Sequence, residues 1–334
     1  MATDRAIDRS RRPLGSTWSD TLRSEAPTLS IAGFFVLMVT VFATQTDAFL
    51  SSTNLLNLLR QAAPLIIVAV AMTFVITTGG IDLSVGSTVA LVNALAAILL
   101  REEIPWPAVV LLMLMTGAVI GLIQGWFIAY EGIPAFIVTL AGLSILRGIA
   151  LLMTQGFSIP ISRDLWFIQL GRGWVFGVPL PAIIAVVVVM AGWIALTKMR
   201  FGRYVTAIGA NAEAARRAGI DIRRRIQMTY VLTGTAAAMA GLIIAARLGS
   251  GSSNAAVAFE LEVIAAVVLG GTSLMGGRGT IVGTVLGALT MAVIGNGLIL
   301  AHISPFFTQI VTGLIILAAI WLNTRIFNRL GQRR

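Results

Sequence analysis

Apolar stretches of similar length recur along the whole chain, separated by polar or glycine-containing connections. A helix that crosses the hydrocarbon core of a bilayer needs about 20 mostly apolar residues, and roughly 17–25 are tolerated. Stretches of this kind occupy residues 28–46, 62–78, 83–100, 107–129, 136–153, 180–197, 227–246, 255–271, 280–300 and 306–323. The pattern therefore predicts an all-α, polytopic transmembrane bundle of about ten spans.

Interruptions mark two regions of this bundle. Gly79 and Gly80 separate the second span from the third, and the glycines of LGGTSLMGG (269–277) follow the eighth span, which Glu260 and Glu262 shorten. Irregular backbone at membrane depth is tolerated where protein or a water-filled cavity surrounds it. We therefore expect broken or re-entrant helices near 79–87 and 260–280. Paired interruptions of this kind point to substrate-pathway residues in transporters.

The low fraction of charged residues and the lack of cysteine exclude several classes of protein. Of the 334 residues, 57% are apolar and 11% are charged, whereas soluble domains carry about 25% charged residues. A water-soluble enzyme is therefore excluded. The chain has no cysteine and one histidine, His302, which excludes disulfides, cysteine-based metal sites and histidine clusters. We predict no catalytic residue and no metal ligand.

The basic residues indicate a topology. With ten spans and a cytoplasmic N-terminus, five basic residues fall in the polar tail 1–27, eight in the loop 198–226, one at Arg278 and four in the tail 324–334. Only five of the 24 fall outside. This bias agrees with the positive-inside rule, so both tails are expected in the cytoplasm, around one membrane domain at 28–323. The positive charge reflects topology, and no nucleic-acid binding is predicted.

The polar tail 1–27 also bears on processing. It is too long for the basic region of a signal peptide, and no small-residue cleavage site follows the first apolar stretch. We expect the first span to be retained.

Nucleotide-binding motifs are absent from the sequence. The glycine-rich segment 269–280, LGGTSLMGGRGT, lacks the lysine of a P-loop and the third glycine of a dinucleotide fingerprint. Lys198 is the one lysine of the chain. The chain is therefore not expected to hydrolyse ATP itself.

The basic loop 198–226 predicts a short helix. Asn211 is a favourable N-cap, the following residues to Ala218 are strong helix formers with Glu213 in the first turn, and Gly219 is a helix stop. Small surface residues at Ala214, Ala215 and Ala218 suit docking into a groove of a partner. The alternative is a solvated basic loop that contacts anionic lipid.

Small residues at four-residue spacing predict close helix packing. They stand at Gly117, Gly121 and Gly125, at Ala237, Gly241 and Ala245, and at Gly279, Gly283 and Gly287. Such stripes let helix backbones approach one another inside lipid. No site is predicted from them.

A few polar residues are candidates for the substrate pathway: Asp82, Ser84, Asn93 and Asn296. Asp82 either caps the helix expected to begin at Leu83 or contacts substrate, and both interpretations stay open. Arg147, inside the fifth span, either pairs with an acid or extends to an interface. The aromatic loop 154–180 is either interfacial or a docking surface.

Four segments, in order, resemble a known family: GGIDLSVGS (79–87), IPAFIVTLAGLSILRG (133–148), GANAEAARRAGI (209–220) and ELEVIAAVVLGGTSLMGGRGT (260–280). They look like the membrane-spanning permease subunit of ribose-type monosaccharide ABC importers, and the resemblance runs from about residue 50 to residue 325. It implies a multi-pass protein of the bacterial inner membrane. The expected substrate is a ribose-like pentose, a hexose or a related small polyol.

The resemblance also implies partners. Two permease subunits, identical or different, form the path, an ATP-binding subunit that uses ATP and Mg drives it, and a periplasmic or extracytoplasmic sugar-binding protein delivers the sugar. This chain would bind no cofactor. The coupling segment of the family corresponds to residues 209–220, which implies ATPase contacts for Gly209, Asn211, Glu213, Ala214, Ala215 and Gly219.

Two other classes compete with this interpretation. A stand-alone secondary transporter or channel for a small polar solute would need coupling acids in the membrane, for which Asp82, Glu260 and Glu262 qualify. A membrane-embedded enzyme is disfavoured because the sequence contains no metalloprotease motif and a single histidine.

Overall fold

The computed structural model describes residues 18–304 together with 307, 310–311, 313–314 and 317. Most of the predicted tail 1–27 and of the tenth predicted span, 306–323, lies outside these residues, as does the whole tail 324–334. Helices dominate the described part. The first helix begins ten residues before the first predicted span, at Trp18.

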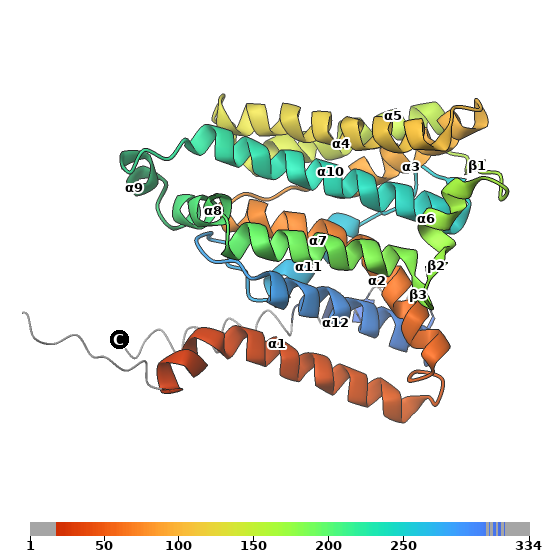
Figure 1. Ribbon diagram of the computed structural model, residues 1–334, viewed down its shortest axis with the longest axis horizontal. Coiled ribbons are helices and arrows are strands. Elements are labelled where there is room, and N and C mark those ends of the chain that lie inside the picture. The colour runs from red at the N-terminus through yellow and green to blue at the C-terminus, as the bar shows by residue number, and fades with distance from the viewer. Residues whose placement is uncertain (1–17, 305–306, 308–309, 312, 315–316, 318–334) are drawn as a thin grey trace, which may run out of the picture.

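Within the described residues eight long helices form a bundle, whose arrangement Figure 1 shows. They are α1 (Trp18–Gln45), α2 (Ser52–Thr77), α3 (Val85–Arg101), α4 (Trp106–Ala129), α5 (Ala135–Thr154), α7 (Leu180–Thr197), α10 (Ile222–Leu248) and α12 (Ile281–Leu300). The shorter helices are η1 (Trp166–Ile168), α6 (Gln169–Arg172), α8 (Arg200–Ala210), α9 (Ala212–Arg217) and α11 (Phe259–Leu269).

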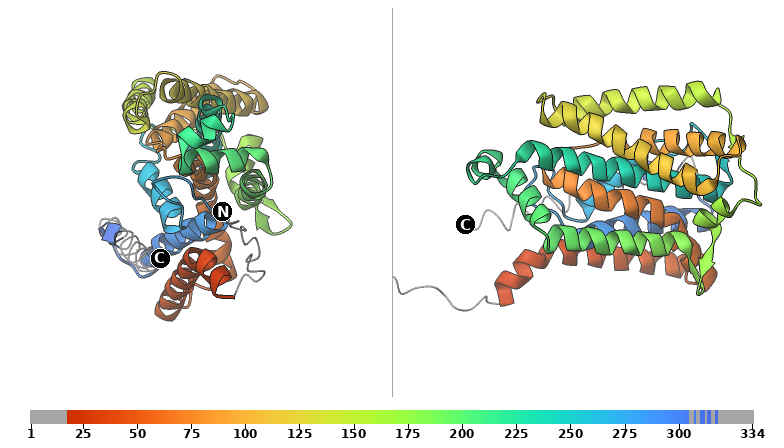
Figure 2. Two further views of the ribbon diagram at one scale, coloured as in Figure 1. Left: turned by 90° about the vertical axis from the view of Figure 1, so that its left-hand side faces the viewer. Right: turned by 45° about the horizontal axis from the view of Figure 1, so that its top comes forward.

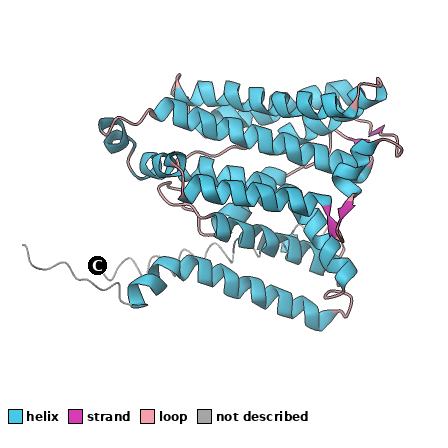
Figure 3. Cartoon of the chain, in the orientation of Figure 1, coloured by secondary structure: helices cyan, strands magenta, loops and turns pink. Residues whose placement is uncertain are grey.

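Two small antiparallel pairs of strands lie at one end of the bundle (Figure 3). The strand β1 (Ile159–Pro160) pairs with β4 (Ser250–Gly251), and β2 (Trp174–Val175) forms a hairpin with β3 (Val178–Pro179). We call this end the hairpin end. The opposite end carries α8 and α9 and is called the α9 end; Figure 2 shows α9 projecting beyond the long helices there.

Six described helices are long and apolar enough to cross a membrane: α2, α4, α5, α7, α10 and α12. Leu29–Gln45 and Val85–Arg101 are apolar but shorter. The eighth predicted span forms the 11-residue helix α11, which agrees with the expectation of a broken helix there. The multi-pass architecture is therefore confirmed, whereas the count of ten spans stays a prediction.

The core lies around α2 and α10. In α2 nearly every side chain from Ala62 to Thr77 is buried, as expected for a helix that is apolar on all sides. Outward-facing apolar side chains of α4, α5 and α7 cover the periphery. The glycine stripe of α4 packs directly on α10: a Cβ at Gly117 would collide with the carbonyl of Gly234, and one at Gly121 with the carbonyl of Tyr230. The predicted close packing of these helices is confirmed.

Candidate functional site

The linker 78–84 interrupts the helical path between α2 and α3. The helix α2 ends at Thr77, Gly79 adopts a left-handed conformation with φ of 85°, and the chain runs back into the bundle in extended form before α3 begins at Val85. Glycine is suited to this turn because it has no Cβ to clash. The break predicted near 79–87 is confirmed.

Asp82 closes this linker. Its side chain is 2% exposed, and its Oδ1 accepts hydrogen bonds from the backbone N–H of Ser84 at 2.9 Å and from the Ser84 hydroxyl at 2.7 Å. The carboxylate therefore organises the turn that leads into α3 and lies where the helix dipole favours a negative charge. The N-cap of α3 is Ser84 and not Asp82, and the helix begins at Val85 and not at the predicted Leu83, so Asp82 forms the turn that precedes the helix and does not cap the helix itself.

Gln124, which was not predicted as a site residue, extends this network to α4. Its side-chain amide lies 2.9–3.0 Å from the Ser84 hydroxyl through both Nε2 and Oε1. A single amide within the apolar stretch 107–129 was the signal available in the sequence. A hydrogen-bonded path thus runs from Asp82 through Ser84 to Gln124.

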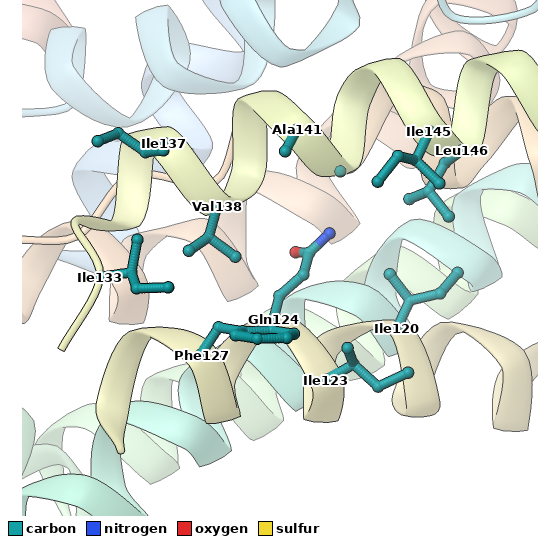
Figure 4. Close-up of a pocket in the computed structure, with 11 residues that line it drawn as sticks. Ile120, Ile123, Gln124, Phe127, Ile133, Ile137, Val138, Ala141, Ile145 and Leu146 are labelled. Atoms are coloured by element: carbon teal, nitrogen blue, oxygen red, sulfur yellow. The ribbon is translucent and has the colours of Figure 1, made fainter. Parts of the chain in front are cut away.

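Gln124 also borders a cavity between α4 and α5. Figure 4 shows its amide pointing between the two helices. The cavity measures about 400 Å³, and its remaining lining is apolar: Ile120, Ile123, Phe127, Ile133, Ile137, Val138, Ala141, Gly142, Ile145 and Leu146. Sugar sites are built from several convergent hydrogen-bonding groups, and this cavity offers one amide. Its chemistry does not suit tight sugar binding by a single chain.

The segment 252–258, which connects β4 to α11, interrupts the helical path a second time, just before the break predicted near 260–280. Arg147 of α5 holds it: Nη1 donates to the carbonyls of Ser253 at 2.6 Å and Ala255 at 2.8 Å, and Nη2 donates to Ala256 at 3.4 Å. Among the described residues no carboxylate lies within ion-pair distance of Arg147, whose guanidinium binds these backbone carbonyls instead.

Backbone strain accompanies this contact. Ala256 and Ala258 have φ values of 55° and 63°, a conformation that costs a non-glycine residue on the order of 1–3 kcal/mol. Such a conformation persists where the surroundings impose it. The guanidinium bonds to Ala255 and Ala256 are part of those surroundings.

The two interruptions meet inside the bundle. Gly86, in the first turn of α3, faces the first turn of α11: a Cβ at this position would collide with the Glu260 carboxylate and lie 2.9 Å from the carbonyl of Ala256. Glu260 thus lies beside a helix N-terminus, where its charge is favourable. Its Oε2 and the buried Ser87 Oγ have no hydrogen-bond partner among the described residues. We call this meeting point the junction.

Asn93 and Asn296 lie apart from each other, and both amides have partners within the chain. Asn93 donates to the carbonyl of Gly241 at 3.3 Å and accepts from the N–H of Ser252 at 2.6 Å. Asn296 exchanges hydrogen bonds of 2.9 and 3.0 Å with Asn54 of α2. Polar side chains often join helices in this way inside membranes, so both residues have a structural role.

The helix predicted in the basic loop is α9. The Asn211 Oδ1 accepts from the N–H of Ala214 at 2.9 Å, Glu213 lies 3.1 Å from Arg217, and Gly219 follows the helix with φ of 79°. The cap, the helix and the stop are confirmed, with the last helical residue at Arg217.

Two residues of this segment differ from expectation. Ala215 is 4% exposed, so the prediction that it lies on the docking surface is wrong; the short helix turns this face toward the chain itself, while Ala214 and Ala218 are exposed. Gly209 packs on the chain as well, because a Cβ there would collide with the Thr77 carbonyl and the Gly277 N–H. Its lack of a side chain is therefore required for packing within the chain itself.

A family model described as "Branched-chain amino acid transport system / permease component" matches residues 54–320. The chain belongs to this permease family. Similar proteins include the ribose import permease protein RbsC of Haemophilus influenzae, 39% identical over 303 residues, which cover 90% of this permease and 92% of that protein.

Two sugar permeases from Escherichia coli K12 are also similar to the chain over most of their length. Its ribose import permease protein RbsC is 40% identical over 87% of the permease and 91% of the relative. Its xylose transport system permease protein XylH is 35% identical over 88% and 90%. The resemblance to ribose-type permeases is confirmed. No solved structure matches the chain.

Proposed function

We propose that this permease is the membrane subunit of an ATP-driven importer for a monosaccharide, with a pentose as the first candidate. The relatives support the substrate class, since proteins named for ribose and for xylose match about nine-tenths of the chain. A hexose or a small polyol is the alternative cargo.

The capped helix α9 carries the proposal of an ATPase partner. It is held at its N-terminus by Asn211 and stands clear of the long helices at the α9 end (Figure 1). Its outer face offers the small side chains of Ala214 and Ala218, which permit close approach to a groove. An ATP-binding subunit that uses ATP and Mg would receive this helix.

The opposite end suits the delivery of sugar. The β2–β3 hairpin exposes Trp174 and Phe176, and Trp166 lies nearby in the same aromatic loop. Exposed aromatic side chains are enriched in protein interfaces. In the proposed arrangement this end faces the periplasm and contacts the sugar-binding protein, while both tails and α9 lie in the cytoplasm. A second permease subunit, identical or different, completes the path.

Reconstitution tests the proposal. The permease is placed in proteoliposomes with the ATPase and the sugar-binding protein encoded beside it, and uptake of labelled ribose and xylose is measured. We expect uptake that requires all components and hydrolysable ATP. Uptake by the permease alone would instead favour a stand-alone transporter, with Glu260 at the junction as the first candidate coupling acid.

A further inference from the structure

The loop between α11 and α12 exposes two apolar side chains at the α9 end. Met275 is 89% exposed and Leu274 is 44% exposed. The loop belongs to the region 260–280, for which the sequence predicted a break in the pathway. In the structure the glycines of this loop pack where α8 ends and α9 begins, beside Gly209 and Ala210.

The loop is held in one conformation. The N–H of Gly277 donates to the carbonyl of Thr77 at 2.9 Å. Within the loop, the N–H of Ser273 donates to the carbonyl of Arg278 and the N–H of Gly276 donates to the carbonyl of Ser273, each at 3.0 Å. Gly276 and Gly277 have φ values of 80° and 75°. A Cβ on Gly276 would come within 3.0 Å of the carbonyl of Gly209, and one on Gly277 within 2.9 Å of the Cα of Ala210. This backbone fits because both positions are glycine.

A rigid loop that presents methionine outward is suited to binding a partner. Methionine adapts its shape to an apolar surface, and a preorganised loop loses little conformational entropy when it docks. The surface continues onto α9 and the start of α10, where five arginines between residues 211 and 225 outnumber Glu213 and Asp221. The matching partner surface is an apolar depression with an acidic rim.

We propose that Leu274 and Met275 form a second docking element for the same ATP-hydrolysing subunit that receives α9. This inference rests on the proposed function, which supplies that partner. Two contact points would fix the orientation of the subunit, whereas one short helix leaves it free to rotate. The loop is also bonded to Thr77, so a displacement of the docked subunit acts directly on the end of α2.

Binding measurements test this element. The full-length permease in lipid nanodiscs is titrated with the ATPase subunit that restores uptake in the reconstitution. We expect Met275→Glu to weaken binding at least tenfold, because a charge replaces an apolar contact, while Met275→Leu stays within about twofold. Leu50→Glu is the matched control: Leu50 is an exposed apolar residue of the loop between α1 and α2, and Figure 1 shows this loop at the hairpin end. Unchanged affinity for Met275→Glu would overturn the inference.

Cross-linking separates this inference from the proposed function. The chain contains no cysteine, so Ala214→Cys and Met275→Cys each introduce a unique site for a photoactivatable probe. We expect both sites to cross-link to the ATPase subunit in the assembled complex. Cross-links from Ala214→Cys alone would overturn the second docking element and leave the α9 contact in place. Labelling of lipid from Met275→Cys would assign the loop to the membrane surface and overturn it as well. Failure at both sites would overturn the ATPase contact itself.

Discussion

The two interrupted segments of the bundle are stabilised in different ways. The linker 78–84 is closed by a contact within itself, since Asp82 bonds to Ser84 two residues later, and Gln124 of α4 and Thr139 of α5 add bonds from outside. The segment 252–258 is held by side chains of other helices: Arg147, which lies more than 100 residues away in the chain, together with Asn93 at Ser252 and Thr154 at Ser253. One interruption is thus a local turn, and the other is a strained loop held by distant helices.

The conformation of the linker therefore depends mainly on residues close in the sequence, whereas that of the segment 252–258 depends on the position of other helices. A turn that closes on itself survives small movements of the surrounding helices, because its donor and acceptor move together. A loop held by Arg147 keeps its conformation only while α5 stays in place beside it. Movements of α5 are therefore expected to change the segment 252–258 and the start of α11 before they change the linker.

The largest expected effect comes from Arg147→Gln. The substitution removes the charged donor from three carbonyls and leaves the strained residue Ala256 without that contact. Hydrogen bonds to charged groups are worth about 1.5–3 kcal/mol each. The 3.4 Å contact with Ala256 is weak and the glutamine amide still donates to one carbonyl, so we expect a net loss of about 2–4 kcal/mol in the free energy of unfolding. Thermal unfolding of the purified permease in detergent measures it.

Arg147→Lys serves as the matched control for charge. An ammonium group keeps the charge but lacks the planar fork that reaches several carbonyls at once, so an intermediate melting temperature is expected. A wild-type melting temperature for Arg147→Gln would show that the segment 252–258 holds without Arg147.

Local features were the most predictable from the sequence. The cap at Asn211, the stop at Gly219 and the turn at Asp82 each depend on residues within three positions, so the side chains that form them are adjacent in the sequence. The close packing of α4 was equally predictable, because small residues at four-residue spacing indicate a helix face that packs closely on a neighbour.

Contacts between distant segments were not predictable. No pattern indicates that Arg147 meets the carbonyls of 253–256, because any residue supplies a carbonyl. Ala215 is the same residue type as the exposed Ala214 and Ala218, and its burial depends on how α9 packs on the rest of the chain. Gly209 and Gly277 approach one another only through the packing of α8 on the loop after α11.

The next effect in size tests the junction itself. Gly86→Ala adds a methyl group against the carbonyl of Ala256 and the Glu260 carboxylate, and overpacking of this kind costs about 1–3 kcal/mol. Gly148→Ala on α5 is the control, since no heavy atom lies within 4 Å of its Cβ position. The melting temperature is expected to fall for the first variant and to hold or rise for the second. Equal values for both would contradict the close approach of α3 and α11.

Substitution of Asp82 distinguishes the turn contact with Ser84 from substrate contact. Asp82→Ala loses the acceptor for both bonds from Ser84 and is expected to cost about 1 kcal/mol, whereas Asp82→Asn retains an acceptor oxygen. We expect Asp82→Asn to transport sugar at close to the wild-type rate in proteoliposomes. Normal assembly with lost transport would show that the charge acts in the pathway.

The smallest effect is expected from Gln124→Met, which removes the bond that ties the linker to α4. The methionine fills a similar volume, and the Ser84 hydroxyl keeps its bond to Asp82, so no buried polar group is left without a partner. Replacing a hydrogen-bonding group under these conditions costs less than about 1 kcal/mol. The linker should therefore tolerate the loss of its distant partner, in contrast to the segment 252–258 after Arg147→Gln. The melting temperatures of the two variants, measured side by side, test this contrast. A drop for Gln124→Met as large as that for Arg147→Gln would mean that both interruptions depend on a neighbouring helix. The turn at Asp82 would then not hold the linker by itself.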